Sequence, residues 1–292
     1  MEKKSTKTLK PLSSQLPRAS AGLNLCHENC EEIWKQRPSL DFLQIHPEHL
    51  IQEKGGTYRD HLDELRDSYP ILLHGFGLSI GSCAPLDLKY LKLVRTILDE
   101  HPEAFFSDHV SWSSLSHHHF HDLLPLIQTE ETLSYVVERV EKCQEIIGQP
   151  LVIENISSYI RYRQSTMTES EFINELCNRS GCFVLLDINN LWANAMNFGD
   201  DPLKIMHEYN KENIRSYHLA GCTKQKTKTG YALIDYHGEA VHEKVWRLYK
   251  EALRHFGPWP TLLEWENNVP PLKRTLEEVQ KISKCLDEVK AS

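Results

Sequence analysis

The stretch Leu151–Val152–Ile153–Glu154–Asn155 joins an apolar, β-prone run to a carboxylate at its end. Similar runs recur along the chain, and each of them ends in a histidine, an aspartate or a glutamate. They are Phe42–His46, Ile71–His74, Phe105–His109, Phe183–Asp187, Ile214–His218 and Thr261–Glu264. Short apolar runs rich in β-branched and aromatic residues are typical of buried strands. We therefore predict seven such strands, with an eighth over Ala19–Leu25 at the start of the series.

Between these runs the apolar spacing changes to the helical period of 3.6 residues. Helices are expected at 58–69, 86–100, 129–147, 202–209, 241–256 and 272–289. The pattern Thr168-x-x-Glu171 is a capping box, which predicts another helix from there to about Arg179. Strands that alternate with helices indicate an α/β fold with parallel strands and right-handed crossovers.

Eight strand–helix units in a chain of 292 residues predict a (β/α)8 TIM barrel. An open doubly wound sheet is the alternative, but no Gly-rich phosphate-binding loop follows any of the strands. Residues 1–18 are polar and are expected to form a flexible tail, so that 19–292 would be a single barrel domain. The connections 113–128 and 220–240 are expected to be long loops, where function usually lies.

The composition argues against several classes of partner. The net charge of −8 disfavours nucleic acid and anionic membranes. No run approaches 18 apolar residues, so we expect no membrane-spanning helix. The eight cysteines are scattered through a chain too large to need disulfides, which favours reduced thiols and a cytoplasmic location.

The carboxyl ends of all barrel strands open on one face, so the polar residues that end the strands should share one mouth. They are His46, His74, His109, Glu154, Asp187, His218 and Glu264, and Asp235 and His237 could join them from the loop after the seventh strand. Imidazole and carboxylate ligands suit iron, zinc or manganese. Nine candidates exceed the needs of one ion, so we predict two or three ions, with Glu154 as a shared ligand. Asn189, Asn190 and Asn197 add neutral oxygens, and one of them could be a ligand or support one.

A simpler interpretation exists for each residue taken alone. One histidine or carboxylate after a strand usually caps a turn, and the run His117–His119 with His121 is most simply an exposed loop. Glu266 is expected to support the ligands rather than to be one. Independent caps do not explain why all seven strand ends carry a residue that can bind metal, because a cap need not be a metal ligand.

The motifs of this chain resemble those of the multinuclear non-heme iron-dependent oxidative enzymes. The segments that carry the resemblance are His74–Ser82, Ser107–Trp112, Asp122–Pro125, Glu154–Tyr159, Leu186–Asn190, His218–Gly221 and Glu264–Glu266. They occur in order and cover residues 20 to about 285. Two positions depart from the family pattern: Cys222 stands where a histidine is frequent, and no arginine follows Leu25.

The resemblance implies a TIM barrel that holds two or three iron ions in mixed Fe(II)/Fe(III) states and uses O2 as co-substrate. It implies oxidation of a ribosomally made precursor peptide, often at cysteine, and often with a separate leader-binding partner protein. The residues implied as catalytic are His74, His109, Glu154, Asp187, His218 and Glu264. Asp235, His237, Asn190 and His46 are implied as further iron ligands, and Asn155 would lie beside the cofactor.

Two other functions remain open at this point. A barrel of the sugar-isomerase or endonuclease type would also place His, Asp and Glu at strand ends, but it would use a colourless divalent ion and no O2. A non-catalytic metal-binding protein would hold metal without changing any peptide.

Overall fold

The computed structural model describes residues 9, 18–52, 55–115, 118–228 and 230–290. The predicted tail, 1–18, lies almost wholly outside these residues. Within those ranges, no helix is both long and apolar enough to cross a membrane.

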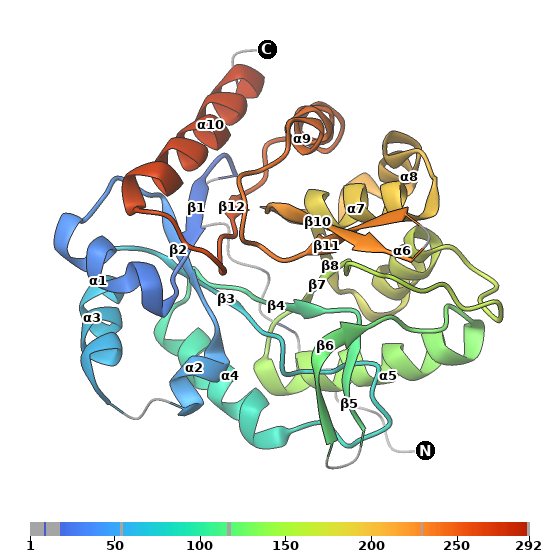
Figure 1. Cartoon of the computed structure of the whole chain (residues 1–292). Helices are drawn as coiled ribbons and strands as arrows, with labels where there is room; N and C mark the ends of the chain where they lie inside the picture. The colour runs from blue at the N-terminus through green and yellow to red at the C-terminus, as the bar shows by residue number, and fades with distance from the viewer. Residues whose placement is uncertain (1–8, 10–17, 53–54, 116–117, 229, 291–292) are drawn as a thin grey trace.

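Eight parallel strands close into one barrel, as predicted (Figure 1). In the order in which they neighbour one another they are β1 (Ala21–Asn24), β12 (Thr261–Leu263), β9 (Ile214–Leu219), β8 (Phe183–Asp187), β7 (Val152–Glu154), β4 (Phe106–His109), β3 (Ile71–His74) and β2 (Phe42–Ile45). Each sequence run that suggested a strand therefore contributes one.

Helices surround the barrel in Figure 1. They are α1 (His27–Gln36), α2 (Pro47–Gln52), α3 (Thr57–Arg66), α4 (Leu88–Glu100), α5 (Glu130–Ile147), α6 (Glu169–Ser180), α7 (Ile188–Phe198), α8 (Pro202–Glu208), α9 (Glu243–Phe256) and α10 (Leu272–Lys290), with a 3-10 turn η1 (Lys211–Asn213) before β9. Three of these, α1, α2 and α7, were not predicted. The capping box of α6 is confirmed: Thr168 Oγ1 accepts from Glu171 N–H at 3.2 Å, and Glu171 Oε2 accepts from Thr168 N–H at 2.8 Å.

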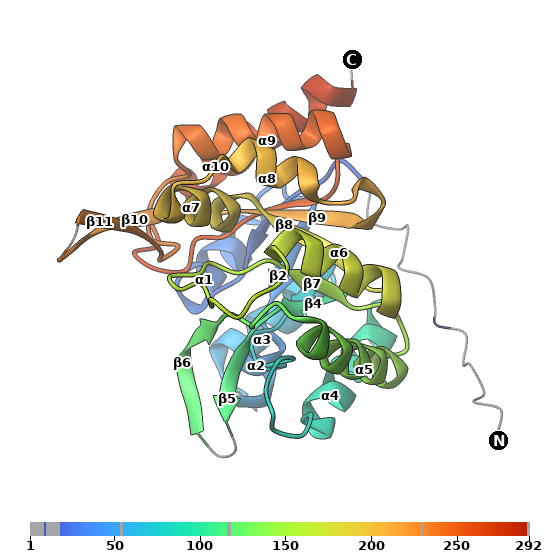
Figure 2. The same cartoon turned by 90° about the vertical axis from the view of Figure 1, so that its right-hand side faces the viewer.

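The expectation that 113–128 and 220–240 are loops was wrong. The first holds an antiparallel hairpin of β5 (Trp112–Leu115) and β6 (His118–Leu124), and the second holds one of β10 (Cys222–Thr227) and β11 (Gly230–Asp235). Part of the presumed histidine loop is therefore strand, and His117 lies outside the described residues. Both hairpins extend from the same side of the molecule (Figure 2).

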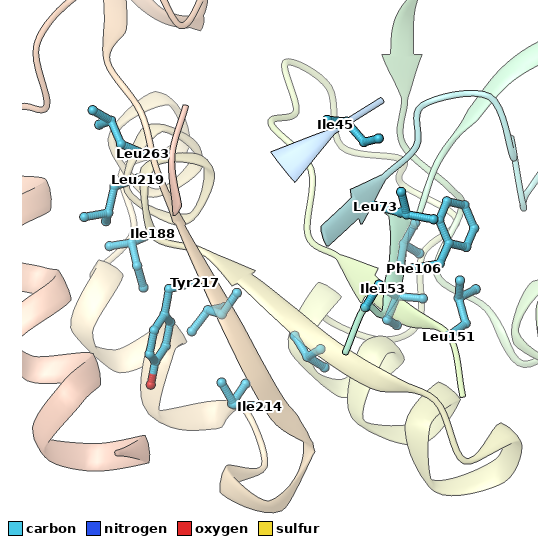
Figure 3. Packing of buried hydrophobic residues seen from close by; sticks show 14 of the residues in the cluster. Ile45, Leu73, Phe106, Leu151, Ile153, Ile188, Ile214, Tyr217, Leu219 and Leu263 are labelled. Atoms are coloured by element: carbon cyan, nitrogen blue, oxygen red, sulfur yellow. The ribbon is translucent and has the colours of Figure 1, made fainter. Parts of the chain in front are cut away.

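Strand residues alternate between two separate apolar layers. Ile45, Leu73 and Ile153 point outward and belong to the large core beneath the helices (Figure 3). Burying a side chain of this size contributes about 1.5–3 kcal/mol. The inward-facing residues form a smaller cluster that fills the barrel, consisting of Phe42, Leu72, Phe105, Val152, Leu185 and Leu262.

The ring of Phe42 fills the barrel interior over a glycine on the neighbouring strand. A Cβ atom at Gly22 would lie 2.3 Å from that ring, so no larger residue fits there without moving it. The barrel is consequently closed by side chains below its mouth, and it is a packed core rather than a channel.

Candidate metal centre

The polar layer of the barrel lies directly above its apolar filling. Side chains alternate along a strand, so a residue two positions beyond an inward-facing one also faces inward. Each of the six residues of the apolar cluster is therefore followed, two positions later, by an inward-facing polar residue. These polar residues are Gln44, His74, Ser107, Glu154, Asp187 and Glu264. The apolar cluster is thus the floor of the candidate site.

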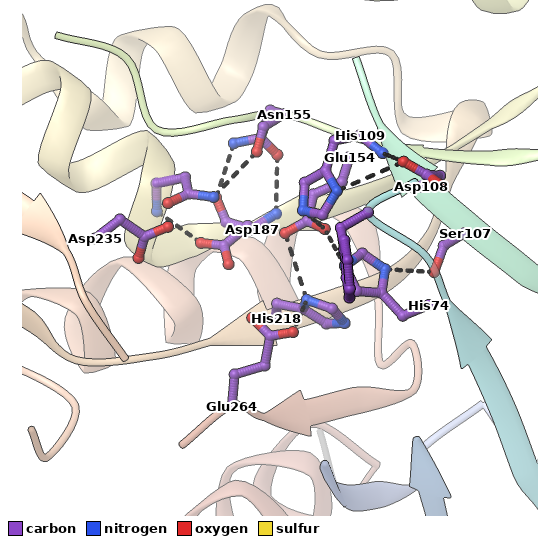
Figure 4. A network of polar contacts seen from close by, with 12 residues as sticks. His74, Ser107, Asp108, His109, Glu154, Asn155, Asp187, His218, Asp235 and Glu264 are labelled. Carbon is purple, nitrogen blue, oxygen red and sulfur yellow. Dashed lines mark hydrogen bonds and ion pairs between the residues drawn. The ribbon is translucent and has the colours of Figure 1, made fainter. Parts of the chain in front are cut away.

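Glu154 lies at the centre of this layer (Figure 4). Its Oε2 atom is 3.2 Å from His74 Nε2 and 3.3 Å from His109 Nε2. Its Oε1 atom is 3.4 Å from His218 Nδ1, which is also 3.1 Å from Glu264 Oε1. One carboxylate thus contacts three imidazoles that come from three different strands.

Among the described residues, three groups have ligand atoms that all lie within 4.8 Å of one another. They are His74, His109 and Glu154; His74, His218 and Glu264; and Glu154, Asp187, His218 and Glu264. His74, Glu154, His218 and Glu264 each belong to two of these groups. His46, Asp235 and His237 are in none of them.

Hydrogen bonds hold two imidazoles in the tautomer that a metal needs. Ser107 Oγ donates to Leu73 O at 3.2 Å, so its lone pair accepts from His74 Nδ1 at 2.9 Å. His218 Nε2 lies 3.0 Å from Gln44 Oε1, which can only accept. In the neutral imidazole form, the remaining nitrogens, Nε2 of His74 and Nδ1 of His218, carry the free lone pair and face the carboxylates. Support of this kind is usual around metal-binding histidines. Burial disfavours the charged form of His218, but Glu264 and Glu154 outweigh it and raise its pKa well above the usual value, so a metal must displace a proton there.

Several buried polar atoms at the same place lie close to polar neighbours but make no hydrogen bond of suitable geometry. They are Glu154 Oε2, Asp187 Oδ2, Asn190 Oδ1, His109 Nδ1 and His218 Nδ1. A buried polar atom left unpaired costs about 1–3 kcal/mol, and more if it is charged. Five such atoms in one layer are unfavourable unless something binds them. All are nitrogen or oxygen ligands, and no cysteine belongs to the three ligand groups within the described part of the chain. This donor set fits iron, zinc or manganese.

Protonation alone does not balance the charges of these imidazoles and carboxylates, as their pKa shifts show. Burial and the neighbouring His109 and His218 hold the pKa of His74 well below its usual value. Burial also disfavours the charged form of His109, but Glu154 and Asp108 outweigh it and raise its pKa to about 9. Burial and the charge of Glu154 raise the pKa of Asp187 well above its ordinary range. Cations other than protons would relieve the repulsion between these carboxylates.

Asp187 is fixed from both sides. Its Oδ1 atom accepts from the backbone N–H of Asn190 at 2.6 Å and so caps α7. The amide of Asn155 accepts from Asp187 N–H at 2.9 Å and donates to Asp187 O at 3.0 Å. Both polar atoms of the Asn155 side chain thus engage the backbone, and we interpret Asn155 as a positioning residue for Asp187. Asn190 lines the cavity beside Glu154, and its Oδ1 atom makes no hydrogen bond.

A second set of residues lies above the cluster, at its entrance. His237 Nε2 is 2.7 Å from Asp235 Oδ1, and its Nδ1 atom is 3.3 Å from Glu266 Oε2. His46 Nε2 is 3.0 Å from Glu266 Oε1, while its Nδ1 is 2.8 Å from His74 O. Glu266 therefore joins His46 to His237.

Two cavities open onto these residues. One of about 280 Å³ is lined by Glu154, Asn190, Tyr159 and Tyr236, and one of about 460 Å³ is lined by His74, Glu264 and Phe76. Both also contact His109, Asp235, His237 and Glu266, so the two cavities adjoin at the entrance to the cluster. A third and larger cavity, of about 590 Å³, lies between the 158–168 segment and α8, and none of the predicted ligands lines it.

Sequence reasoning missed Gln44 and Ser107. Neither residue ends a strand, and neither is a usual metal ligand. Their roles depend on neighbours across the barrel, which no spacing along the chain reveals. Inward-facing polar residues in otherwise apolar strands were the available signal.

Cys222 occupies the position at which the sequence departs from the family pattern. Its thiol donates to Asn189 Oδ1 at 3.0 Å, and burial together with Asp235 raises its pKa to about 12. The thiol therefore stays protonated beside the cluster.

Relatives of known sequence resemble this chain over nearly its whole length. A UPF0276 protein of Acaryochloris marina is 38% identical over 260 residues, which are 89% of this chain and 92% of that protein. Another, from Vibrio parahaemolyticus, is 36% identical over 94% of both chains.

Solved structures share the fold at low sequence identity. A D-tagatose 3-epimerase-like protein matches with a TM-score of 0.60 and 16% identity, over 94% of this chain and 100% of that one. Endonuclease IV from Thermus thermophilus gives 0.58 and 15%, over 93% and 100%, and a xylose isomerase-like barrel from Mycobacterium smegmatis in complex with magnesium gives 0.58 and 11%, over 93% and 97%. These likenesses confirm the TIM-barrel fold.

The family described as RiPP precursor modification enzyme MbnB/TglH/ChrH matches residues 20–287. This match covers the whole barrel and every strand-end ligand candidate, and it confirms the family resemblance seen in the motifs. The chain therefore belongs to the MbnB/TglH/ChrH family of RiPP precursor modification enzymes.

Proposed function

We propose that this chain is an iron-dependent enzyme that uses O2 to oxidise a ribosomally made precursor peptide, with cysteine as the residue modified. One observation carries the proposal: three imidazoles meet one buried carboxylate, Glu154, and hydrogen bonds to the far nitrogens of two of them turn the other nitrogen toward it. Family membership supports the precursor peptide as substrate.

We propose His74, His109, Glu154, Asp187, His218 and Glu264 as the primary iron ligands. The remaining ligands would come from residues at the entrance, namely Asp235, His237, Asn190 and His46. Two or three ions would be bound, with Glu154 as a shared ligand. Bound iron would supply the redox chemistry, accepting electrons from the peptide and passing them to O2.

The chain's own residues have three tasks in this proposal. Ser107 and Gln44 orient the rings of His74 and His218 so that their ligand nitrogens face the cluster. The apolar floor that includes Leu72 and Val152 excludes water from below the cluster. The cavity beside Tyr159 would admit one side chain of the peptide from above.

The deciding experiment compares aerobic and anaerobic reactions of iron-loaded protein with the peptide encoded beside its gene. A mass change that requires both iron and O2 is expected, measured by mass spectrometry with Glu154→Gln as the inactive control. Full turnover without O2, or with Mg²⁺ or Mn²⁺ alone, would instead support the isomerase- or hydrolase-type alternative. Iron binding with no change in any peptide would support the non-catalytic one.

A leader-binding partner protein and a cytoplasmic location belong to the same proposal. The first is tested by adding the protein product of a neighbouring gene to the reaction and measuring the rate of peptide modification. The second is tested by cell fractionation.

A further inference from the structure

The hairpin β10–β11 extends past α7 and has one free edge (Figure 2). Its two strands pair only with each other within the described ranges. The outer edge of β11 is covered: Leu233 N–H donates to Asn197 Oδ1 at 2.8 Å, and Leu233 O accepts from Asn197 Nδ2 at 2.9 Å. Asp235 N–H likewise donates to the Tyr159 hydroxyl at 3.1 Å. The edge left over is that of β10.

The register shows which backbone groups this edge presents. In an antiparallel pair, directly opposed residues either exchange hydrogen bonds with each other or both point their groups outward. Leu233 points outward and lies opposite Lys224, so the N–H and C=O of Lys224 point away from the hairpin. By the same alternation those of Lys226 do too. Such groups are a template on which another strand can add.

The free edge leads to the metal centre. Cys222, at the base of β10, lies opposite Asp235, which lines both cavities of the cluster. At the base the backbone of Glu239 packs against Gly221, where a Cβ atom would lie 2.0 Å from Glu239 O. The Thr223 hydroxyl donates to Glu239 Oε1 at 3.0 Å, so the open part of the edge begins beyond Thr223 and includes Lys224 and Lys226.

This edge is positively charged in a chain whose net charge is −8. Lys224, Lys226 and Lys228 are exposed, and no ion pair joins any of them to another described residue. Lys224 Nζ lies 4.3 Å from the centre of the Tyr231 ring, which places a cation and an aromatic face together on one side of the hairpin. The complementary partner is an extended segment with negative side chains.

We propose that the free edge of β10 docks the peptide substrate as an added strand, with acidic side chains beside Lys224 and Lys226. The identification of this strand as the substrate rests on the proposed function. Lys226 lies four positions beyond Cys222, which is about 13 Å of extended chain. The acidic residues should therefore lie about three to six positions from the residue that enters the cavity.

Lysines on a free strand edge also have a simpler role, because they keep the edge from pairing with another copy of the chain. The two roles give different results when the charge is removed. A protective role predicts self-association of the neutral variant, and a docking role predicts loss of binding to an acidic strand.

The test uses metal-loaded full-length protein and a fluorescein-labelled peptide of alternating glutamate and threonine residues. Its binding is measured by fluorescence anisotropy. The double variant Lys224→Gln/Lys226→Gln should weaken binding about tenfold, whereas Lys89→Gln/Lys92→Gln on α4 should leave it unchanged. Lys224→Pro should also weaken it, since proline removes an outward N–H without breaking a hydrogen bond inside the hairpin. Circular dichroism checks that each variant is folded.

Hydrogen exchange locates the binding site directly. Backbone amides of 222–227 should exchange more slowly when the peptide is bound. No binding, binding that ignores both lysine changes, or binding without protection of these amides would overturn the proposal, as would self-association of the double variant with unchanged binding.

Modification of the precursor peptide is measured separately with the same variants. Turnover that is independent of Lys224 and Lys226 would reject this docking site and leave the proposed function standing. Docking with protected amides but no O2-dependent modification would support this docking site and reject the proposed function.

Discussion

Ser107 determines which nitrogen of His74 faces the metal centre. Because its hydroxyl donates to Leu73 O, it can only accept from His74 Nδ1, and Nε2 is left free for a metal. We predict that Ser107→Ala lowers metal affinity about tenfold, the lower end of the range for such supporting residues. Metal titration followed by competition with a chelator measures this.

Ser20 offers a matched control for that substitution. It is also a buried serine, but its Oγ atom has no hydrogen-bond partner. Ser20→Ala should leave metal affinity unchanged. Equal affinities for the two variants would mean that Ser107 does not orient the imidazole.

His109 makes metal binding sensitive to pH. In the metal-free protein its pKa is raised to about 9, because Glu154 and Asp108 outweigh the effect of burial. It is therefore protonated at neutral pH, and a metal must displace that proton. We predict that metal addition at pH 7 releases protons, that affinity rises until about pH 9, and that His109→Ala releases about one proton fewer. Calorimetry in buffers of different ionisation enthalpy counts these protons, and equal release by both proteins would contradict the assignment.

At the scale of elements, the reciprocal cap of α6 gives a prediction about stability alone. Thr168 and Glu171 satisfy each other's backbone N–H groups at the start of the helix. Thr168→Ala should lower the free energy of unfolding by about 1 kcal/mol. Urea unfolding measures this, with Thr96→Ala on α4 as a helix-interior comparison whose effect should be smaller. Metal content should stay the same in both variants.

The sequence predicted the barrel strands because each is a short apolar run buried on both sides, and because polar residues mark where each run ends. It predicted the long helices because they keep a regular apolar stripe, as α5 does with Leu133, Val136 and Val140. α7 was missed because it follows β8 directly, with Asp187 as its N-cap and no connecting loop, and because it is buried on most sides. The hairpins were missed because β10 and β11 carry few apolar residues and are stabilised mainly by each other and by α7.

The candidate ligands could be predicted in the same way, since the topology of a barrel brings strand ends together whatever the loops do. Glu264 directly follows β12, and His74, Glu154 and Asp187 are the last residues of their strands. The supporting residues could not be predicted, because Gln44 meets His218 only through closure of the barrel. Contacts between residues 174 positions apart in sequence leave no local pattern.

At the scale of the whole molecule, the barrel buries a group of carboxylates whose negative charges are not balanced by the residues packed around them. Burial and Glu154 raise the pKa of Asp187 well above its ordinary range, with further contributions from Asp235 and Glu264. A carboxyl group whose pKa is raised by folding is harder to ionise in the folded chain. Its charge therefore subtracts from stability at pH values above its unfolded pKa of about 3.9. The metal-free protein should accordingly be less stable at neutral pH than the same fold with a neutral side chain there.

Metal removal and one substitution test this together. Chelation should lower the melting temperature of the native protein, because a ligand bound only to the folded state stabilises it. Asp187→Asn should raise the melting temperature of the metal-free protein by about 2 °C or more, since the amide keeps an oxygen to cap α7 and removes the repelled charge. The same variant should lose most of the stabilisation by metal, because one ligand oxygen is gone. Scanning calorimetry with and without metal gives all four values. A metal-free variant less stable than the metal-free native protein would show that the charges of this cluster are already balanced without an ion.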